Sequence, residues 1–274
     1  MDVGTLILLF LGGCAGGLLA GLLGVGGGLV FVVIFTNYLT ALGVPDSKIA
    51  QLIIANSMVA IFFAGTSGSI KHYLNGHFYF KPVIISGFFA ALSSVATTYI
   101  INHTSWYNKQ LFSVIFISIT IYIAYRIFAG SSGKDVNAGE EKFSLVKLMQ
   151  IGALGGTLAA LSGVGGGIIM VPMLIKMLNI QIKKATAISL GIITVMALVS
   201  SVYSMLINPK INMNIAHSYG LIVFPMVIPV VAGSVICSPF GVTLSKIIPE
   251  RTVQILFGAF LLLVTLNMIY NLWL

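Results

Sequence analysis

The sequence is poor in charged residues, which make up only 7% of its 274 positions. A soluble domain carries about 25% charged residues, so this chain has too few to cover its surface with side chains that favour water. Hydrophobic residues amount to 58%, and the mean hydropathy is +1.07. These values predict an all-α, polytopic membrane protein with room for about eight to ten segments of roughly 20 residues each.

Acidic residues and cysteines are scarcest. None of the six Asp and Glu residues falls within an expected membrane segment, which excludes a carboxylate proton relay of the usual kind. The four histidines lie near segment ends, where a surface role is favoured, so proton coupling stays an open alternative. Cys14 and Cys237 lie in apolar segments without a CxxC or Cys/His cluster, and we expect them to be packing residues. We predict no metal site, no cofactor and no enzymatic activity.

The net charge of +8 would suggest a nucleic-acid partner in a soluble protein. No basic run interleaved with aromatic residues is present, and in a membrane protein Lys and Arg mark cytoplasmic loops. We therefore predict no nucleic-acid binding. Asp2 stands where a secretory signal would carry a basic residue, so we expect the first apolar segment to be retained.

Glycine, in contrast, is abundant and is arranged in a repeat. From Gly16 to Val30, ten of fifteen positions are identical to the residue 139 positions further on, so the cluster Gly24–Gly28 returns as Gly163–Gly167. Glycine clusters inside apolar sequence are expected to break a membrane helix. Matching breaks in two halves of a chain are the best sequence indicator of a transporter's binding site.

Charged and polar stretches divide the chain into two similar halves. We predict a first transmembrane repeat over residues 1–129, a cytoplasmic linker over 130–144 and a second repeat over 145–274. Each repeat is expected to hold a glycine-broken helical hairpin followed by three membrane helices. The expected segments after the hairpins are Ile49–Ile70, Pro82–Ile101, Gln110–Phe128, Ala185–Ile207, Ile215–Val242 and Val253–Leu274.

The distribution of Lys and Arg predicts how the halves are oriented. If each broken segment enters and leaves on one side, the repeats are inverted and 11 of the 14 basic residues fall on one side, leaving Lys48, Lys109 and Lys210 on the other. If each broken segment crosses once, the split is 7 to 7. Because basic residues concentrate on the cytoplasmic side, the inverted arrangement is favoured. It places both termini outside the cytoplasm and the central linker inside it. We expect the membrane to be the cell inner membrane.

The two breaks predict an anion site made of backbone. The helices that begin after Gly28 and Gly167 would point their N-termini, each with about half a positive charge, at the midplane of the membrane. Neighbouring polar residues could add hydrogen bonds. The predicted substrate-binding residues are Gly24, Gly26, Gly27, Gly28, Asn56, Ser57, Ser162, Gly163, Gly165, Gly166, Gly167, Thr186 and Ser189.

Each of these features also has a purely structural interpretation. Spacings such as those within Gly12–Gly21 favour close helix packing over ligand binding, whereas four glycines in five residues exceed what packing requires. The Ser, Thr and Asn side chains are equally compatible with hydrogen bonds between helices. Whether Ser57 corresponds to Ser189 is left open, because the first half has a longer loop after its hairpin.

The two motifs GLLGVGGG and ALSGVGGG resemble the sulfite exporter TauE/SafE family, also called the toluenesulfonate uptake permease family. Val164–Pro172, Ala185–Leu190 and Pro249–Arg251 are similar to stretches of that family, as is Gly76–Phe78 in the first half. Val33 departs from the pattern, since the second half has Pro172 at the equivalent position. The resemblance spans essentially the whole chain.

The resemblance implies transport of small sulfur-containing anions, such as sulfite, thiosulfate or organosulfonates, which some members export and others take up. We therefore expect a secondary transporter that works by alternating access, with the lipid bilayer as its other partner. The sequence leaves open an anion channel, a carrier for a small organic carboxylate on the same scaffold, the direction of transport and the oligomeric state.

Overall fold

The computed structural model describes residues 2–104, 107–128, 143–207 and 217–249, together with single positions 251, 252, 255, 262, 265 and 266. The described part is helical apart from one short pair of strands. The linker expected at 130–144 and the last expected segment, Val253–Leu274, lie almost entirely outside the described residues. In chain order the elements are α1 (Val3–Leu23), α2 (Gly28–Ala41), α3 (Asp46–Leu74), α4 (Phe80–His103), α5 (Lys109–Phe128), α6 (Leu145–Ser162), α7 (Gly167–Leu178), α8 (Ile182–Leu206), β1 (Ser218–Tyr219), β2 (Ile222–Val223) and α9 (Phe224–Leu244).

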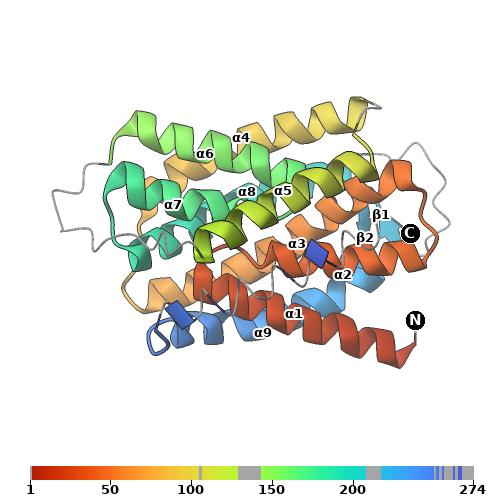
Figure 1. The fold of residues 1–274 in the computed structure, drawn as a ribbon, viewed down its shortest axis with the longest axis horizontal. Helices are drawn as coiled ribbons and strands as arrows, with labels where there is room; N and C mark the ends of the chain where they lie inside the picture. Colours follow the sequence, from red (N-terminus) through yellow and green to blue (C-terminus); the bar gives the residue numbers. More distant parts are fainter. Residues whose placement is uncertain are drawn as a thin grey trace.

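Among the described residues, six helices are long and apolar enough to cross a membrane: α1, α3, α4, α6, α8 and α9. The chain is therefore an all-α, multi-pass membrane protein, as its composition predicts. The helices run roughly along one common direction (Figure 1). Many of the large side chains on their outer faces are apolar and exposed, which is what a lipid-facing surface requires.

Each glycine cluster joins two helices that fold back on each other. A side-chain carbon at Gly16 in α1 would lie 2.2 Å from the Phe31 ring in α2, and Gly12 lies beside Ile34. In the second half, Gly155 in α6 lies against Met170 in α7. Contacts that pair earlier residues of one helix with later residues of the next define antiparallel hairpins. Both expected broken hairpins are present.

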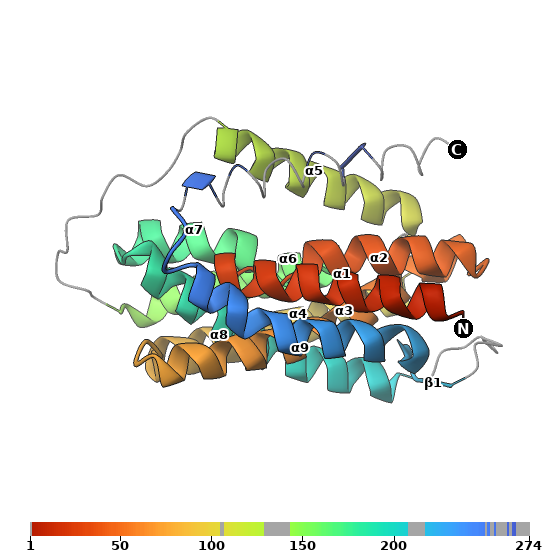
Figure 2. The ribbon, with the colours of Figure 1, turned by 90° about the horizontal axis from the view of Figure 1, so that it is seen from below.

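Helices α3 and α8 form the centre of the molecule. In their most apolar stretches 83% and 67% of residues are buried, against 33–44% for the other four long helices. The two run antiparallel, because Gly65 of α3 packs beside Thr194 of α8 and the later Gly68 packs beside the earlier Leu190. Figure 2 shows α1 and α9 lying side by side and α5 standing outside the main bundle.

Two outer pairs of helices pack on this centre with their backbones in close contact. A side-chain carbon at Gly17 of α1 would lie 2.5 Å from the Ser234 carbonyl oxygen of α9, and one at Gly156 of α6 would lie 2.2 Å from the Ala90 carbonyl oxygen of α4. The packing role expected for Gly12–Gly21 is thereby confirmed. If α1 is exchanged with α6, α3 with α8 and α4 with α9, the α1–α9 pair becomes the α6–α4 pair, and the central α3–α8 pair stays the same.

One predicted boundary is wrong. The segment expected at Ile215–Val242 does not begin as a helix, because Ser218–Val223 forms the antiparallel pair β1–β2. Gly220, with φ at +57°, turns the chain there, and α9 begins only at Phe224, with Pro225 in its first turn. The apolar character of Leu221–Val223 conceals this turn from a hydropathy reading.

Candidate functional site

The two glycine breaks adopt the same backbone conformation, residue by residue. The φ angles of Gly24, Gly26 and Gly27 are +68°, +81° and +72°, and those of the equivalent second-half glycines are +68°, +92° and +70°. Side chains other than glycine rarely adopt these angles. Both clusters therefore end one helix and start the next within four residues. This is why the same glycine pattern occurs in each half.

The structure brings the two breaks into direct contact. A side-chain carbon at Gly28 would lie 2.4 Å from the Val164 carbonyl oxygen, and one at Gly167 would lie 2.7 Å from the Gly24 carbonyl oxygen. Segments that lie 139 positions apart in the chain are thus packed backbone to backbone. The N-termini of α2 and α7 consequently begin in the same small region.

This region lies at the middle of the two central helices. The side chain of Ile61 of α3 lies beside Gly26, Gly28 and Gly165. Ile193 of α8 lies beside Gly26 and Gly167. Sequence reasoning does not identify these two isoleucines, because an apolar residue carries no chemical signal in an apolar helix. Their equivalence becomes visible only when α3 and α8 are aligned at a separation of 132 positions.

The chemistry of the region favours an anion. The N–H groups of the first turn of a helix have no partner within that helix, and the helix dipole adds about half a positive charge. No Lys, Arg, Asp or Glu lies within Gly24–Gly28 or Gly163–Gly167. Two helix N-termini that meet without a charged side chain can hold a small anion through backbone donors.

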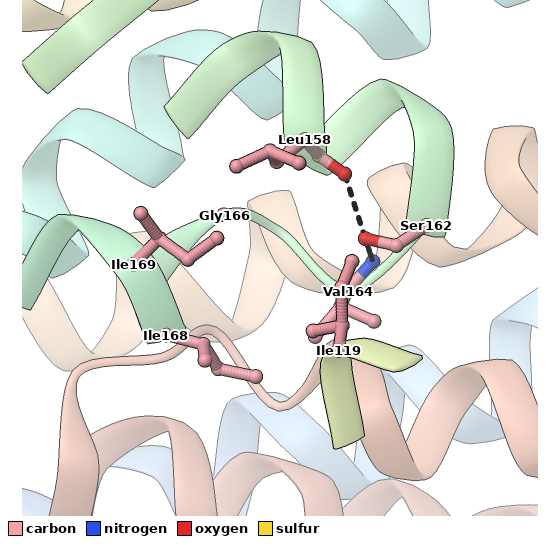
Figure 3. Close-up of a pocket in the computed structure, with 7 residues that line it drawn as sticks. All are labelled: Ile119, Leu158, Ser162, Val164, Gly166, Ile168 and Ile169. Atoms are coloured by element: carbon pink, nitrogen blue, oxygen red, sulfur yellow. Dashed lines mark hydrogen bonds between the residues drawn. The ribbon is translucent and has the colours of Figure 1, made fainter. Parts of the chain in front are cut away.

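A small pocket opens at the second break (Figure 3). Its space is about 10 Å³, on the order of one water molecule. The Ser162 hydroxyl at its edge donates to the Leu158 carbonyl, at 2.7 Å, and accepts from the Val164 N–H, at 3.4 Å. The pocket is lined by Ile119 of α5, Leu158 and Ser162 of α6, Val164 and Gly166 of the break, and Ile168 and Ile169 of α7.

Helix α5 from the first half covers this second break. Besides Ile119 in the pocket wall, the Tyr107 hydroxyl just before α5 donates to the Leu161 carbonyl at the end of α6. Burial raises the pKa of Tyr107 above its usual value, so this phenol stays a protonated donor. The first half therefore contributes residues to the surroundings of the second half's break.

The predicted residues Ser57 and Ser189 differ in what they bind. Both are completely buried. The Ser189 hydroxyl donates to the Gly24 carbonyl at 2.9 Å, whereas the Ser57 hydroxyl has no hydrogen-bond partner. Ser57 shares a face of α3 with Ile54 and Ile61, which lie beside Gly163 and Gly165 respectively.

The contacts also settle how the two halves align after the hairpins. Thr186 of α8 packs against Gly24, and Ile54 of α3 packs against Gly163. These pairs make Ile54 the equivalent of Thr186 and Ser57 the equivalent of Ser189, at a separation of 132 positions in each case. Ser57 therefore occupies in α3 the position from which Ser189, in α8, binds the first break.

Two other predicted residues use their side chains elsewhere in this conformation. The Asn56 amide donates to the carbonyls of Leu52, at 2.7 Å, and Leu221, at 2.9 Å, and accepts from the Val223 N–H, at 2.8 Å. The Thr186 hydroxyl donates to the Lys183 carbonyl at 2.9 Å. The backbone and Cβ of Thr186 lie against Gly24, but its hydroxyl does not bind the break. The structure therefore brings together the glycines and Ser189 and places Ser162 beside them, but it does not direct the side chains of Asn56 and Thr186 into the site.

Comparison with known proteins yields a family and several relatives that match over more than nine tenths of both chains. The sequence profile of the family described as "Sulfite exporter TauE/SafE" matches residues 8–268. A "Probable membrane transporter protein" of Haemophilus influenzae is 27% identical over 271 residues, covering 96% of this chain and 97% of the relative.

Two more distant relatives carry similar descriptions. A probable membrane transporter protein of Methanocaldococcus jannaschii is 23% identical, covering 93% of this chain and 91% of its own. One of Bacillus subtilis is 23% identical, covering 97% and 98%. No solved structure matches this chain.

Proposed function

Because the chain belongs to the sulfite exporter TauE/SafE family, we propose that it is a secondary transporter for a small sulfur-containing anion, such as sulfite, thiosulfate or an organosulfonate. The observation that carries the proposal is the contact between the two glycine breaks at the middle of α3 and α8. Two helix N-termini converge there, and neither break contains a charged residue, which suits an anion that must be bound and then released.

In this proposal the anion is held mainly by backbone N–H groups. Those of Gly26, Gly27 and Gly28 approach from one hairpin, and those of Gly165, Gly166 and Gly167 approach from the other. The N–H groups of Gly24 and Gly163 donate to the Ala20 and Ala159 carbonyls, at 2.9 Å and 2.8 Å, so in this conformation these two glycines shape the breaks and do not donate to the anion. Ser57 supplies a hydroxyl that is free to donate, and Ser162 lies at the edge of the pocket. Asn56, Thr186 and Ser189 contribute only when their present hydrogen bonds are exchanged during the transport cycle.

We propose alternating access between two inverted repeats. The antiparallel arrangement of the equivalent helices α3 and α8, and the matching pairs α1 with α9 and α6 with α4, support repeats related by an axis in the membrane plane. The distribution of basic residues supports an orientation with both termini outside the cytoplasm and the linker inside it. The membrane in this proposal is the cell inner membrane. Rocking of one repeat against the other would expose the site to each side in turn.

Flux into proteoliposomes tests the proposal. Sulfite, thiosulfate, sulfate, a sulfonate and a carboxylate would be offered in turn, each with and without a proton gradient. The proposal predicts saturable flux of at least one sulfur anion, and a response to the gradient would identify proton coupling. Flux of the carboxylate alone would contradict the substrate class, and a steady current without saturable exchange would indicate a channel.

A further inference from the structure

Short stretches with similar backbone features follow the two central helices, at opposite ends of the antiparallel pair. Gly76, after α3, has φ at +74°, and Gly220, after α8, has φ at +57°. The next residue in each loop donates its N–H back to the preceding helix: His77 to the His72 carbonyl, at 3.0 Å, and Leu221 to the Ser204 carbonyl, at 3.1 Å. His72 of α3 and Ser204 of α8 are 132 positions apart, so they are equivalent residues when the two helices are aligned. We refer to Gly76–Tyr79 and Gly220–Val223 as the α3 loop and the α8 loop.

A buried amide fastens the α8 loop to α3. Asn56 is fully buried, and it donates to the Leu221 carbonyl, at 2.9 Å, and accepts from the Val223 N–H, at 2.8 Å. Leu221, Ile222 and Val223 are themselves buried in the bundle. Moving this loop would therefore leave a buried amide and two backbone groups without partners, which costs about 1–3 kcal/mol for each unsatisfied group.

The α3 loop lacks such a fastening. The residue of α8 equivalent to Asn56 is Ile188, which has no hydrogen-bonding group in its side chain. His77 is exposed, and Phe78 and Tyr79 are half-buried. Phe78 rests on Gly191, where a side-chain carbon would lie 3.4 Å from its ring, and the Lys184 Nζ lies 5.5 Å from the centroid of the Tyr79 ring. These contacts break at a lower free-energy cost than buried hydrogen bonds.

We infer that the two loops are unequal gates: Asn56 holds the α8 loop shut, and the α3 loop opens first. The resting protein would then admit its substrate from the side of the α3 loop, which is the cytoplasmic side in the orientation that the basic residues favour. This inference rests on the proposed transport function, since a gate needs a path to close. Its test measures the loops alone and does not require transport.

Thiol labelling of the purified protein measures how often each loop opens. In a background with Cys14→Ser and Cys237→Ser, Ile222→Cys reports on the α8 loop, and Phe78→Cys reports on the α3 loop. Phe78 is already partly exposed, whereas Ile222 is completely buried, so labelling of Ile222→Cys with a water-soluble maleimide requires the α8 loop to move, and Phe78→Cys serves as the accessible reference. Adding Asn56→Ile, the residue found in the other half, should raise labelling of Ile222→Cys by about tenfold or more, because two hydrogen bonds to the loop are lost. Labelling of Phe78→Cys should stay unchanged.

Gln51→Leu is the matched control, because it removes another buried amide of α3, one that lies 3.5 Å from the Ile101 carbonyl rather than at the α8 loop. It should leave labelling of Ile222→Cys unchanged. Unaltered labelling of Ile222→Cys in a folded Asn56→Ile variant would overturn the inference.

Hydrogen exchange in the unmodified chain provides a second measurement that needs no variant. Amides of the α8 loop should exchange more slowly than those of the α3 loop, and equal or reversed protection would overturn the inference.

Discussion

The two glycine breaks have the same backbone and different surroundings. At the first break, a side-chain carbon on Gly24 would lie 2.6 Å from the Thr186 carbonyl oxygen and 2.7 Å from its Cα, and the Ser189 hydroxyl binds the Gly24 carbonyl. At the second break, a side-chain carbon on Gly163 would lie 3.1 Å from the Val32 side chain and no closer than 3.5 Å to any backbone atom. The equivalent hydroxyl there, on Ser57, is unpartnered.

This difference indicates that the repeated motif sets the shape of the backbone, while the neighbouring helices decide how each copy is used. At the first break, α8 packs against Gly24 and its Ser189 hydroxyl binds the Gly24 carbonyl. At the second break, the Ser57 hydroxyl has no partner and a small pocket opens between the break and α5. In the proposed mechanism the second break is the more open half of the anion site, and the first is its rigid counterpart.

Alanine substitutions at the two helix ends should break the comparison most strongly. Gly24 and Gly163 have the same φ of +68°, so alanine at either costs roughly 1–2 kcal/mol in backbone strain. At Gly24 the overlap with Thr186 adds about 1–3 kcal/mol. We expect Gly24→Ala to lower the free energy of unfolding by about 2–5 kcal/mol and Gly163→Ala by about 1–2 kcal/mol, measured by SDS titration in mixed micelles. Equal losses would show that the first break is not more tightly held.

Removing the two serine hydroxyls should separate stability from binding. Ser189→Ala leaves the buried Gly24 carbonyl without its donor, which should cost about 1–3 kcal/mol of stability. Ser57→Ala breaks no hydrogen bond and removes a buried hydroxyl that has no partner, so the free energy of unfolding should not fall. The affinity for the transported anion should nevertheless fall by about three- to tenfold. Unfolding and binding titrations on both variants would check this, and an unchanged affinity in Ser57→Ala would remove that residue from the site.

Much of the fold could be predicted from the sequence because charges mark where membrane helices end. The expected segment Ile49–Ile70 lies within α3, and Pro82–Ile101 lies within α4. The glycine repeat predicts both hairpins, since the breaking of apolar helices by glycine clusters is a local effect. The boundary at Ile215 failed because Leu221–Val223 is as apolar in a buried turn as it would be in a helix.

The site was less predictable, because its details depend on contacts between distant segments. No pattern in the sequence shows that the Asn56 amide binds Leu221 and Val223, 165 and 167 positions away. The alignment of Ser57 with Ser189 was also ambiguous, since the repeat separation changes from 139 to 132 after the hairpins. Only the packing of Ile54 and Thr186 against the two breaks resolves it.

The most direct test of the central claim is the affinity for the transported anion after a methyl group is added at the contact of the breaks. Gly26→Ala and Gly165→Ala place a carbon beside the backbone donors, 3.2 Å from Ile61. Gly43→Ala is the matched control, because Gly43 has φ at +71° and open space around it, so it carries the backbone strain alone. The account predicts at least about tenfold weaker binding in the first two variants and wild-type affinity in the third. Equal affinity in all three would contradict an anion site at the glycine breaks.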